Sequence, residues 1–135
     1  MTTLEKLRSL QEQGFIGGAQ SSAIRQGLRG SDGPAFDAKV DAVHQLVHTM
    51  PKTYEQNSLG EQAIVYLHYF GGSTDAFITE RDSESEQHQA FGLMDLFGDG
   101  GELGYISLPE ITESGLELDL YWTPKTLAEI RKERS

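Results

Sequence analysis

The hydrophobic pattern of this chain changes its period at Pro51. Before the proline, residues 36–50 (FDAKVDAVHQLVHTM) carry one apolar stripe at helical spacing, formed by Phe36, Val40, Val43, Val47 and Met50. After it, short apolar runs bounded by glycines and polar residues are typical of strands. A proline cannot continue the helix, so the change predicts an α+β chain with helices first and strands second.

Two further helices are expected before Pro51. Residues 2–14 repeat leucine at helical spacing up to Gly14, and residues 21–30 predict a helix capped at Ser21 or Ser22 and ended at Gly30. A short C-terminal helix is predicted after residue 122, with Thr123 as its cap and Pro124 in its first turn.

The second part of the chain predicts about five antiparallel strands. They are expected at residues 63–70, buried on both faces, and at 75–81, 89–97, 102–107 and 116–122. In the last of these, Leu116, Leu118, Leu120 and Trp122 share one face, and Glu117, Asp119 and Tyr121 share the other. Between strands, Ser107 and Glu110 have capping-box spacing, which predicts one helical turn ended by Gly115. We therefore expect a helical segment, 1–49, packed on an acidic antiparallel-sheet region, 50–135, as one compact unit.

Composition excludes several classes of protein. The 135 residues include no cysteine, which excludes disulfides, thiolate zinc sites and cysteine nucleophiles. No run approaches the about 18 apolar residues of a membrane span, and the N-terminus lacks the apolar core of a secretory signal. These features predict a cytoplasmic protein without membrane contact.

The net charge belongs to one part of the chain. Residues 1–49 are balanced, whereas from residue 50 onward six basic residues face sixteen acids, which accounts for the whole formal charge of −10. Arg25 and Arg29 have helix-turn-helix placement, but a neutral helical segment on an acidic body is a poor phosphate-binding surface. The charge therefore favours a basic protein partner over nucleic acid.

The glycine-rich stretch 98–101 (GDGG) lies between two predicted strands. Asp99-Gly100 is typical of a two-residue hairpin turn, and no helix follows that would complete a phosphate loop. A weak cation site at Asp95, Asp99 and Glu102 stays open as the alternative.

Histidines offer a second candidate for metal binding. His44 and His48 are four residues apart on a helix, a spacing that can place two imidazoles on one metal ion. Gln45 stands where a zincin has glutamate, so we favour two half-buried histidines beside the apolar stripe over a metal site. His68 is predicted to be a core histidine with a hydrogen-bond partner, and His88 to be solvated. No cofactor or metal is predicted.

Residues 50–130 carry a more specific pattern in TYEQ (53–56), AFGL (90–93), ELGYIS (102–107) and DLYWTPKTLAEI (119–130). With this pattern the chain resembles a small domain of unknown function that is widespread on bacterial plasmids and integrative elements. That family commonly has a tryptophan-aromatic pair near Ala76 and Phe77, where this chain keeps one aromatic residue. The resemblance implies a mobile-element setting and supplies no catalytic residues.

Setting and charge together predict an acidic, non-enzymatic binding protein of a mobile element. By mimicking DNA it would occupy the basic channel of a host restriction or CRISPR nuclease. A structural assembly protein and a cation-dependent accessory of DNA transfer are the alternatives. The carboxylates expected to project outward and bind the partner are Glu80, Asp82, Glu84, Glu86, Glu117 and Asp119.

Overall fold

Three helices open the chain in the computed structural model, which describes residues 1–82, 88–98 and 100–134. They are α1 (Thr3–Glu12), α2 (Gly18–Arg29) and α3 (Gly33–Thr49). Thr2 caps α1 by accepting from the Glu5 N–H, and the Glu5 side chain accepts from the Thr2 N–H in return. The C-terminal ends of all three helices agree with the prediction. Helix α2 begins before the predicted serine cap and buries Ser21 within the helix, and α3 begins at Gly33, before the predicted segment 36–50.

The sheet confirms the predicted α+β class. Five antiparallel strands lie in the order β5-β4-β3-β2-β6, and a short pair, β1 with β7, lies beside them. The bounds are β1 (Ile64–Val65), β2 (Leu67–Gly71), β3 (Thr74–Arg81), β4 (Gln89–Leu96), β5 (Glu102–Ser107), β6 (Glu117–Leu118) and β7 (Lys125–Thr126). Helix α4 (Leu108–Glu113) follows β5, and α5 (Leu127–Arg134) follows β7.

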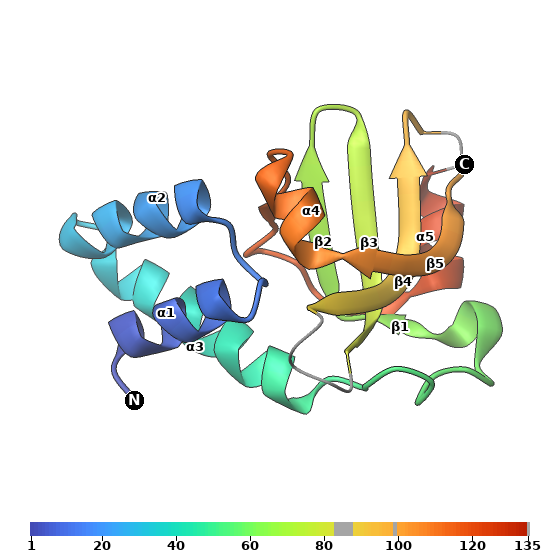
Figure 1. Ribbon diagram of the computed structural model, residues 1–135, viewed down its shortest axis with the longest axis horizontal. Helices are drawn as coiled ribbons and strands as arrows, with labels where there is room; N and C mark the ends of the chain where they lie inside the picture. Colours follow the sequence, from blue (N-terminus) through green and yellow to red (C-terminus); the bar gives the residue numbers. More distant parts are fainter. Residues whose placement is uncertain (83–87, 99, 135) are drawn as a thin grey trace.

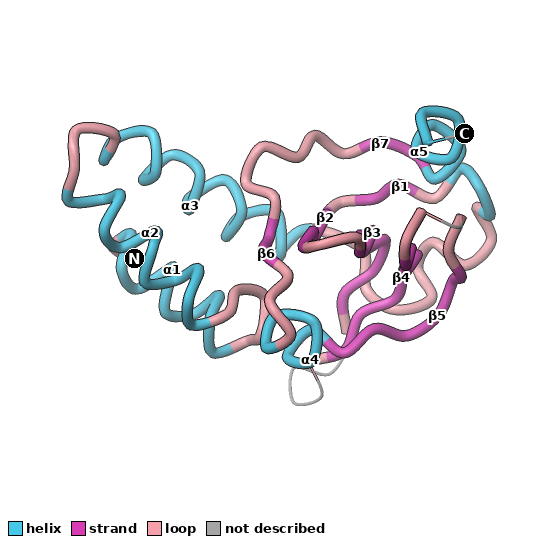
Figure 2. The backbone as a smooth tube through the Cα atoms, turned by 90° about the horizontal axis from the view of Figure 1, so that it is seen from above, coloured by secondary structure: helices cyan, strands magenta, loops and turns pink. Residues whose placement is uncertain are grey.

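Helices cover both faces of the sheet. The larger buried cluster joins the helices of residues 1–49 and α4 to one face, through side chains such as Leu67 and Ile78. Tyr69 crosses this core and donates its hydroxyl to the Phe15 carbonyl at 2.6 Å. Figure 1 shows α1, α2 and α3 gathered on one side of the molecule. Figure 2 shows α4 and α5 on opposite sides of the sheet.

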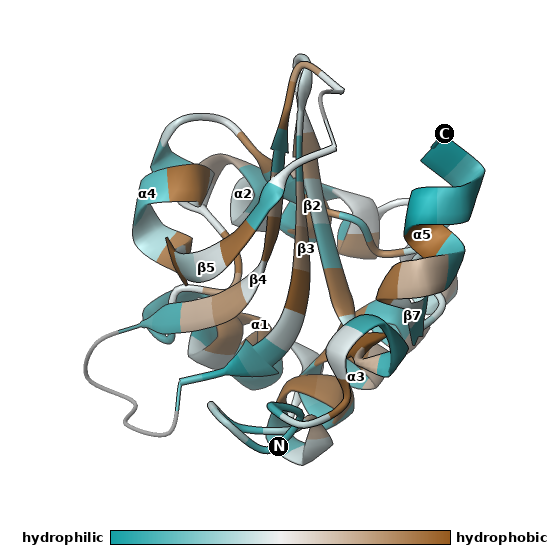
Figure 3. Cartoon of the chain, turned by 90° about the vertical axis from the view of Figure 1, so that its right-hand side faces the viewer, coloured by the Kyte–Doolittle hydropathy of each residue, from teal (hydrophilic) through white to brown (hydrophobic). Residues whose placement is uncertain are grey.

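A smaller buried cluster fills the other face. Phe77 and Leu93 of the sheet pack there against Leu127 and Ile130 of α5, with Val65 of β1 beside them. Figure 3, which colours the chain by hydropathy, shows hydrophobic stretches along β3 and β4 and a hydrophilic C-terminal turn of α5. We call this the α5 face of the sheet.

Two predicted strands differ from the structure. Residues 63–70 form two strands with alternating burial, and the strand buried on both faces is β3, because β3 is the central strand between the two helical layers. The predicted strand 116–122 is reduced to β6. The chain turns after it, where the Tyr121 N–H donates to Asp119 Oδ1 at 2.9 Å. Leu118 and Trp122 therefore lie in different clusters and not on one face.

The short helices α4 and α5 each begin directly after a residue whose side chain caps the helix. Ser107 caps α4 as predicted, and Gly115 follows that helix with φ of +105°. The prediction of Thr123 as the cap of α5 is wrong. Lys125 and Thr126 first pair with β1, so Thr126 becomes the cap, accepting from the Glu129 N–H at 3.1 Å while Glu129 accepts from the Thr126 N–H.

Across the described ranges, no helix combines the length and apolar character that crossing a membrane requires.

Candidate functional site

The six carboxylates predicted to bind a partner do not form one exposed surface. Glu117 is exposed and Asp82 is half-buried. Glu84 and Glu86 lie outside the described residues. Glu80 and Asp119 are both engaged within the protein, so their predicted outward projection is wrong.

Glu80 is buried at 4% exposure. Its carboxylate accepts from the Tyr54 N–H at 3.0 Å and from the Gln56 N–H at 2.6 Å. The register of β3 against β4 shifts between Ile78 and Glu80, which changes the alternation of side chains at that point. The segment that contains Tyr54 and Gln56 then covers the carboxylate. A count of alternating residues could not show either effect.

Asp119 is bound to His68. The Nδ1 atom of His68 lies 3.0 Å from Asp119 Oδ2, and its Nε2 atom lies 2.7 Å from Asp75 Oδ1. Phe77 stacks on the ring with 4.9 Å between centroids, and Trp122 packs at the same centroid distance. The prediction that His68 has a hydrogen-bond partner is confirmed.

Arg134 extends this arrangement toward the end of α5. Its Nη2 lies 3.2 Å from Asp75 Oδ2 and 2.8 Å from Asp95 Oδ2, and its guanidinium lies over the Phe77 ring. Asp95 is 2% exposed. We call this set the α5-face network, whose members are Asp119, His68, Asp75, Arg134 and Asp95.

The α5-face network holds His68 firmly. An ionised carboxylate can only accept hydrogen bonds. The contacts of His68 with Asp119 and Asp75 are therefore both hydrogen bonds only when each ring nitrogen of His68 carries a proton. Both ring nitrogens are then occupied and aromatic side chains pack around the ring. A general base needs a nitrogen within reach of substrate, so this arrangement supports a structural role that ties α5 and β6 to the sheet.

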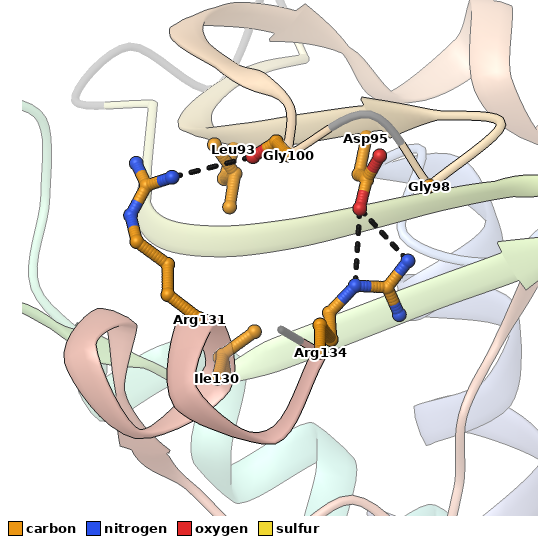
Figure 4. Close-up of a pocket in the computed structure, with 7 residues that line it drawn as sticks. All are labelled: Leu93, Asp95, Gly98, Gly100, Ile130, Arg131 and Arg134. Atoms are coloured by element: carbon orange, nitrogen blue, oxygen red, sulfur yellow. Dashed lines mark hydrogen bonds and ion pairs between the residues drawn. The ribbon is translucent and has the colours of Figure 1, made fainter.

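A cavity of about 310 Å³ borders the α5-face network. Figure 4 shows Arg131 and Arg134 entering from α5, with Asp95 and the glycines of the β4–β5 connection opposite them. Leu93 and Ile130 supply apolar lining. Arg131 Nη1 donates to the Gly100 carbonyl at 3.3 Å, and Arg134 is already paired with Asp95. The cations that line the cavity are therefore engaged with the protein itself.

The glycine-rich stretch is the tip of the β4–β5 hairpin, as predicted. It is longer than the predicted two-residue turn, because residues 97–101 connect the strands. Phe97 and the described glycines of the tip, Gly98, Gly100 and Gly101, have positive φ. Of the candidate cation ligands, Asp95 is held by Arg134, Glu102 is exposed on β5, and Asp99 lies outside the described residues. The described residues contain no group of three His, Asp or Glu placed to hold a metal.

The histidine pair on α3 packs ring against ring. The centroids of His44 and His48 are 4.4 Å apart, and His48 Nδ1 contacts the His44 carbonyl at 2.8 Å. Burial lowers the pKa of His44, and the charge of His48 lowers it further.

The prediction that His88 is solvated is wrong. His88 is half-buried against Gly14, because the start of β4 packs on the α1–α2 connection.

Two surface features were not predicted from the sequence, apart from the exposure of Glu117, which belongs to the second of them. Large apolar side chains are exposed on the β4–β5 hairpin, at Leu96, Phe97, Leu103 and Tyr105. Exposed carboxylates also occur on and just after α4, at Glu110, Glu113 and Glu117, which we call the α4–β6 acidic patch. The sequence analysis predicts only a capping role for Glu110, although the polar face of so short a helix also indicates exposure.

The α4–β6 acidic patch has no counter-charge of its own. None of the ion pairs among the described residues involves it. The basic side chains after residue 50 are concentrated elsewhere, since four of the six lie between residues 125 and 134. Three of those four, Lys125, Arg131 and Arg134, are paired with acids.

No protein-family model, curated protein or solved structure matches this chain.

Proposed function

We propose that this protein is a non-enzymatic binding module that takes a basic protein surface as its partner. The observation that carries the proposal is the separation of charge. The α4–β6 acidic patch has no cation paired with it in the described part of the chain, whereas Lys125 of β7 and Arg131 and Arg134 of α5 are paired with acids. Exposed charges of one sign raise the rate of encounter with a surface of opposite sign.

The setting of the proposal comes from the resemblance of residues 50–130 to a domain of plasmids and integrative elements. A protein carried by such elements gains from blocking host nucleases. The DNA channel of a restriction or RNA-guided nuclease is a basic surface, and clustered carboxylates can occupy it in place of phosphates. We therefore propose host defence nucleases as the partner class, with the protein acting in the cytoplasm and not binding nucleic acid directly.

A purified nuclease tests this proposal. DNA binding by a restriction endonuclease, and by an RNA-guided nuclease loaded with its guide, is measured while this protein is titrated. We expect inhibition that weakens steeply with salt and is lost when Glu110, Glu113 and Glu117 are all changed to Lys. A matched variant with Glu12, Asp32 and Asp37 changed to Lys carries the same charge change on the helical layer, and it should still inhibit. Undiminished DNA binding by every nuclease in the panel would overturn the proposed partner class.

A structural assembly protein is the second candidate function. The exposed apolar side chains of the β4–β5 hairpin favour it, because contiguous apolar surface often marks a contact between proteins. Sedimentation velocity over a range of concentrations distinguishes the two functions. An assembly protein self-associates and keeps its complexes at high salt, whereas binding through the acidic patch requires a partner and is sensitive to salt.

A further inference from the structure

We propose that β5 accepts an extended basic segment of a protein partner as an added strand, with one Lys or Arg side chain of that segment entering a cavity beside Glu80. The inference rests on the proposed function, the binding of a basic partner, and names where and how that partner docks.

Strand β5 has a free edge. It is the last strand of the sheet and pairs with β4 alone among the strands of the described chain. An edge strand presents a row of unpaired N–H and C=O groups to any extended segment. Natural proteins usually protect such an edge with lysine or proline, but β5 (ELGYIS) contains neither.

The side chains of β5 also suit an added strand. Leu103 pairs with Leu93 and Tyr105 pairs with Phe91, so both project to the α5 face of the sheet. Leu103 remains 47% exposed and Tyr105 57% exposed, although Leu93 beside them is buried. Alternating apolar contacts along a free edge are the side-chain part of strand addition.

A cavity of about 170 Å³ lies next to these residues and is lined by Tyr54, Glu80, Phe91 and Leu103 among others. Tyr54 is one of the residues that line it, and the Tyr54 hydroxyl contacts the Tyr105 hydroxyl at 2.7 Å. Pockets for whole small molecules begin at about 300 Å³. The smaller volume fits one long side chain from a neighbouring strand.

Glu80 determines the charge of that side chain. Its carboxylate is buried and is bound by two backbone N–H groups, and no ion pair among the described residues includes it. A buried charge without a counter-ion is costly, and a cation in the adjacent cavity would compensate it. The pKa of Tyr105 is raised, first by the hydrogen bond with Tyr54 and in lesser part by the charges of Glu80 and Asp82.

The same charges argue against a second copy of this chain as the occupant. Edge-to-edge pairing of two β5 strands would supply no Lys or Arg for the cavity beside Glu80, because β5 contains none. A basic segment supplies the missing charge.

The test uses a short fluorescent peptide that alternates valine with threonine, has arginine at its centre and lysine at each end. Binding is followed by fluorescence anisotropy. One control peptide replaces the central arginine with neutral citrulline. Another keeps every charge but has proline at alternate positions, which removes strand hydrogen bonds. We expect a Kd below about 1 mM for the first peptide, and binding about tenfold weaker for each control.

Two variants of the protein form a matched pair. Tyr105→Lys places a cation on the edge strand and should weaken binding about tenfold. Tyr121→Lys makes the same change at a side chain that is 79% exposed and lies beyond β6, at the opposite edge of the sheet, and it should bind within about twofold of the unchanged protein. Hydrogen exchange should slow at residues 102–107 when the peptide is bound.

The proposal is overturned if the first peptide does not bind, if the proline peptide binds equally well, if the two lysine variants behave alike, or if exchange at β5 is unchanged. Self-association with slow exchange at β5 before peptide is added would assign the edge to a second copy instead. Nuclease inhibition that survives Tyr105→Lys but is lost on reversal of the α4–β6 acidic patch would overturn edge docking and leave the proposed function standing.

Discussion

Arg134 in the last turn of α5 lies 2.8 Å from Asp95 in β4, and this ion pair holds α5 against the sheet. Asp95 is buried whereas Arg134 is partly exposed, so Asp95 needs the ion pair more than Arg134, whose charge water partly solvates. Removing the arginine leaves a buried carboxylate without its cation, which is the more costly loss.

Arg134→Met should lower the free energy of unfolding by about 2 kcal/mol, less than the about 3–5 kcal/mol of fully buried pairs because Arg134 is partly solvated. Urea denaturation measures the change. In an Asp95→Asn background the same substitution should cost less than half as much, since the fully buried charge is gone and only the half-buried Asp75 still pairs with the arginine. Equal costs in both backgrounds would show that the ion pair does not hold α5.

Trp122→Ala should cost about 3 kcal/mol, because the indole packs on Phe77 and His68. Trp122→Phe keeps much of the apolar contact but loses the hydrogen bond from Nε1 to the Val65 carbonyl, so it should cost about 1 kcal/mol. Thermal unfolding of the two variants compares them. An equally stable alanine variant would contradict the packing of the α5 face.

Gly92 and Gly104 are paired across β4 and β5, yet a methyl group at each would meet different surroundings. A Cβ at Gly92 would lie 2.0 Å from the Phe77 carbonyl oxygen, whereas nothing lies within 4 Å of a Cβ at Gly104. Gly92→Ala should therefore destabilise the protein by about 3 kcal/mol or more. Gly104→Ala should change stability by less than about 1 kcal/mol. Denaturation midpoints that do not differ would refute this close approach of β3 to β4.

The lowered pKa of His44 makes stability depend on pH. Below its ordinary value of about 6.5, the unfolded chain binds a proton that the folded protein resists, so stability falls as pH falls through this range. His44→Gln should flatten the stability profile just below pH 6.5 and leave it unchanged well above. Chemical denaturation across this range measures both profiles, and an unchanged slope would contradict the prediction.

Magnesium, manganese or calcium should not raise the melting temperature, because Arg134 already neutralises Asp95 and a bound ion would have to displace it. Differential scanning calorimetry with each ion provides the test. A rise that Glu102→Gln or Asp99→Asn abolishes would establish the alternative cation site at the β4–β5 hairpin.

The elements that sequence analysis predicted well depend on short-range chemistry. The stripe from Val40 to Met50 and the stop at Pro51 locate α3, and Ser107 locates α4, since each signal acts within a turn or two of helix. The class of fold followed from the change of hydrophobic period, which is also local.

Local sequence patterns did not predict which face of the sheet each strand residue occupies. A single register shift after Ile78 and a covering segment from the preceding loop bury Glu80, although its neighbours in sequence are polar. A turn after Leu118 sends Trp122 to the opposite face from the leucines it follows. Each of these outcomes depends on residues that are distant in sequence.

The residues alone indicate the three N-terminal helices and where each one stops, the α+β class and the acidic character after Pro51, because helical period, stop signals and charge are properties of neighbouring residues. Which carboxylates are free depends on contacts between distant parts of the chain. Asp95, Asp119 and Glu80 are bound by Arg134, His68 and the backbone of Tyr54 and Gln56, whereas the α4–β6 acidic patch has no such partner among the described residues. The reason is physical: a carboxylate leaves water only where distant parts of the chain bring it a donor or a cation.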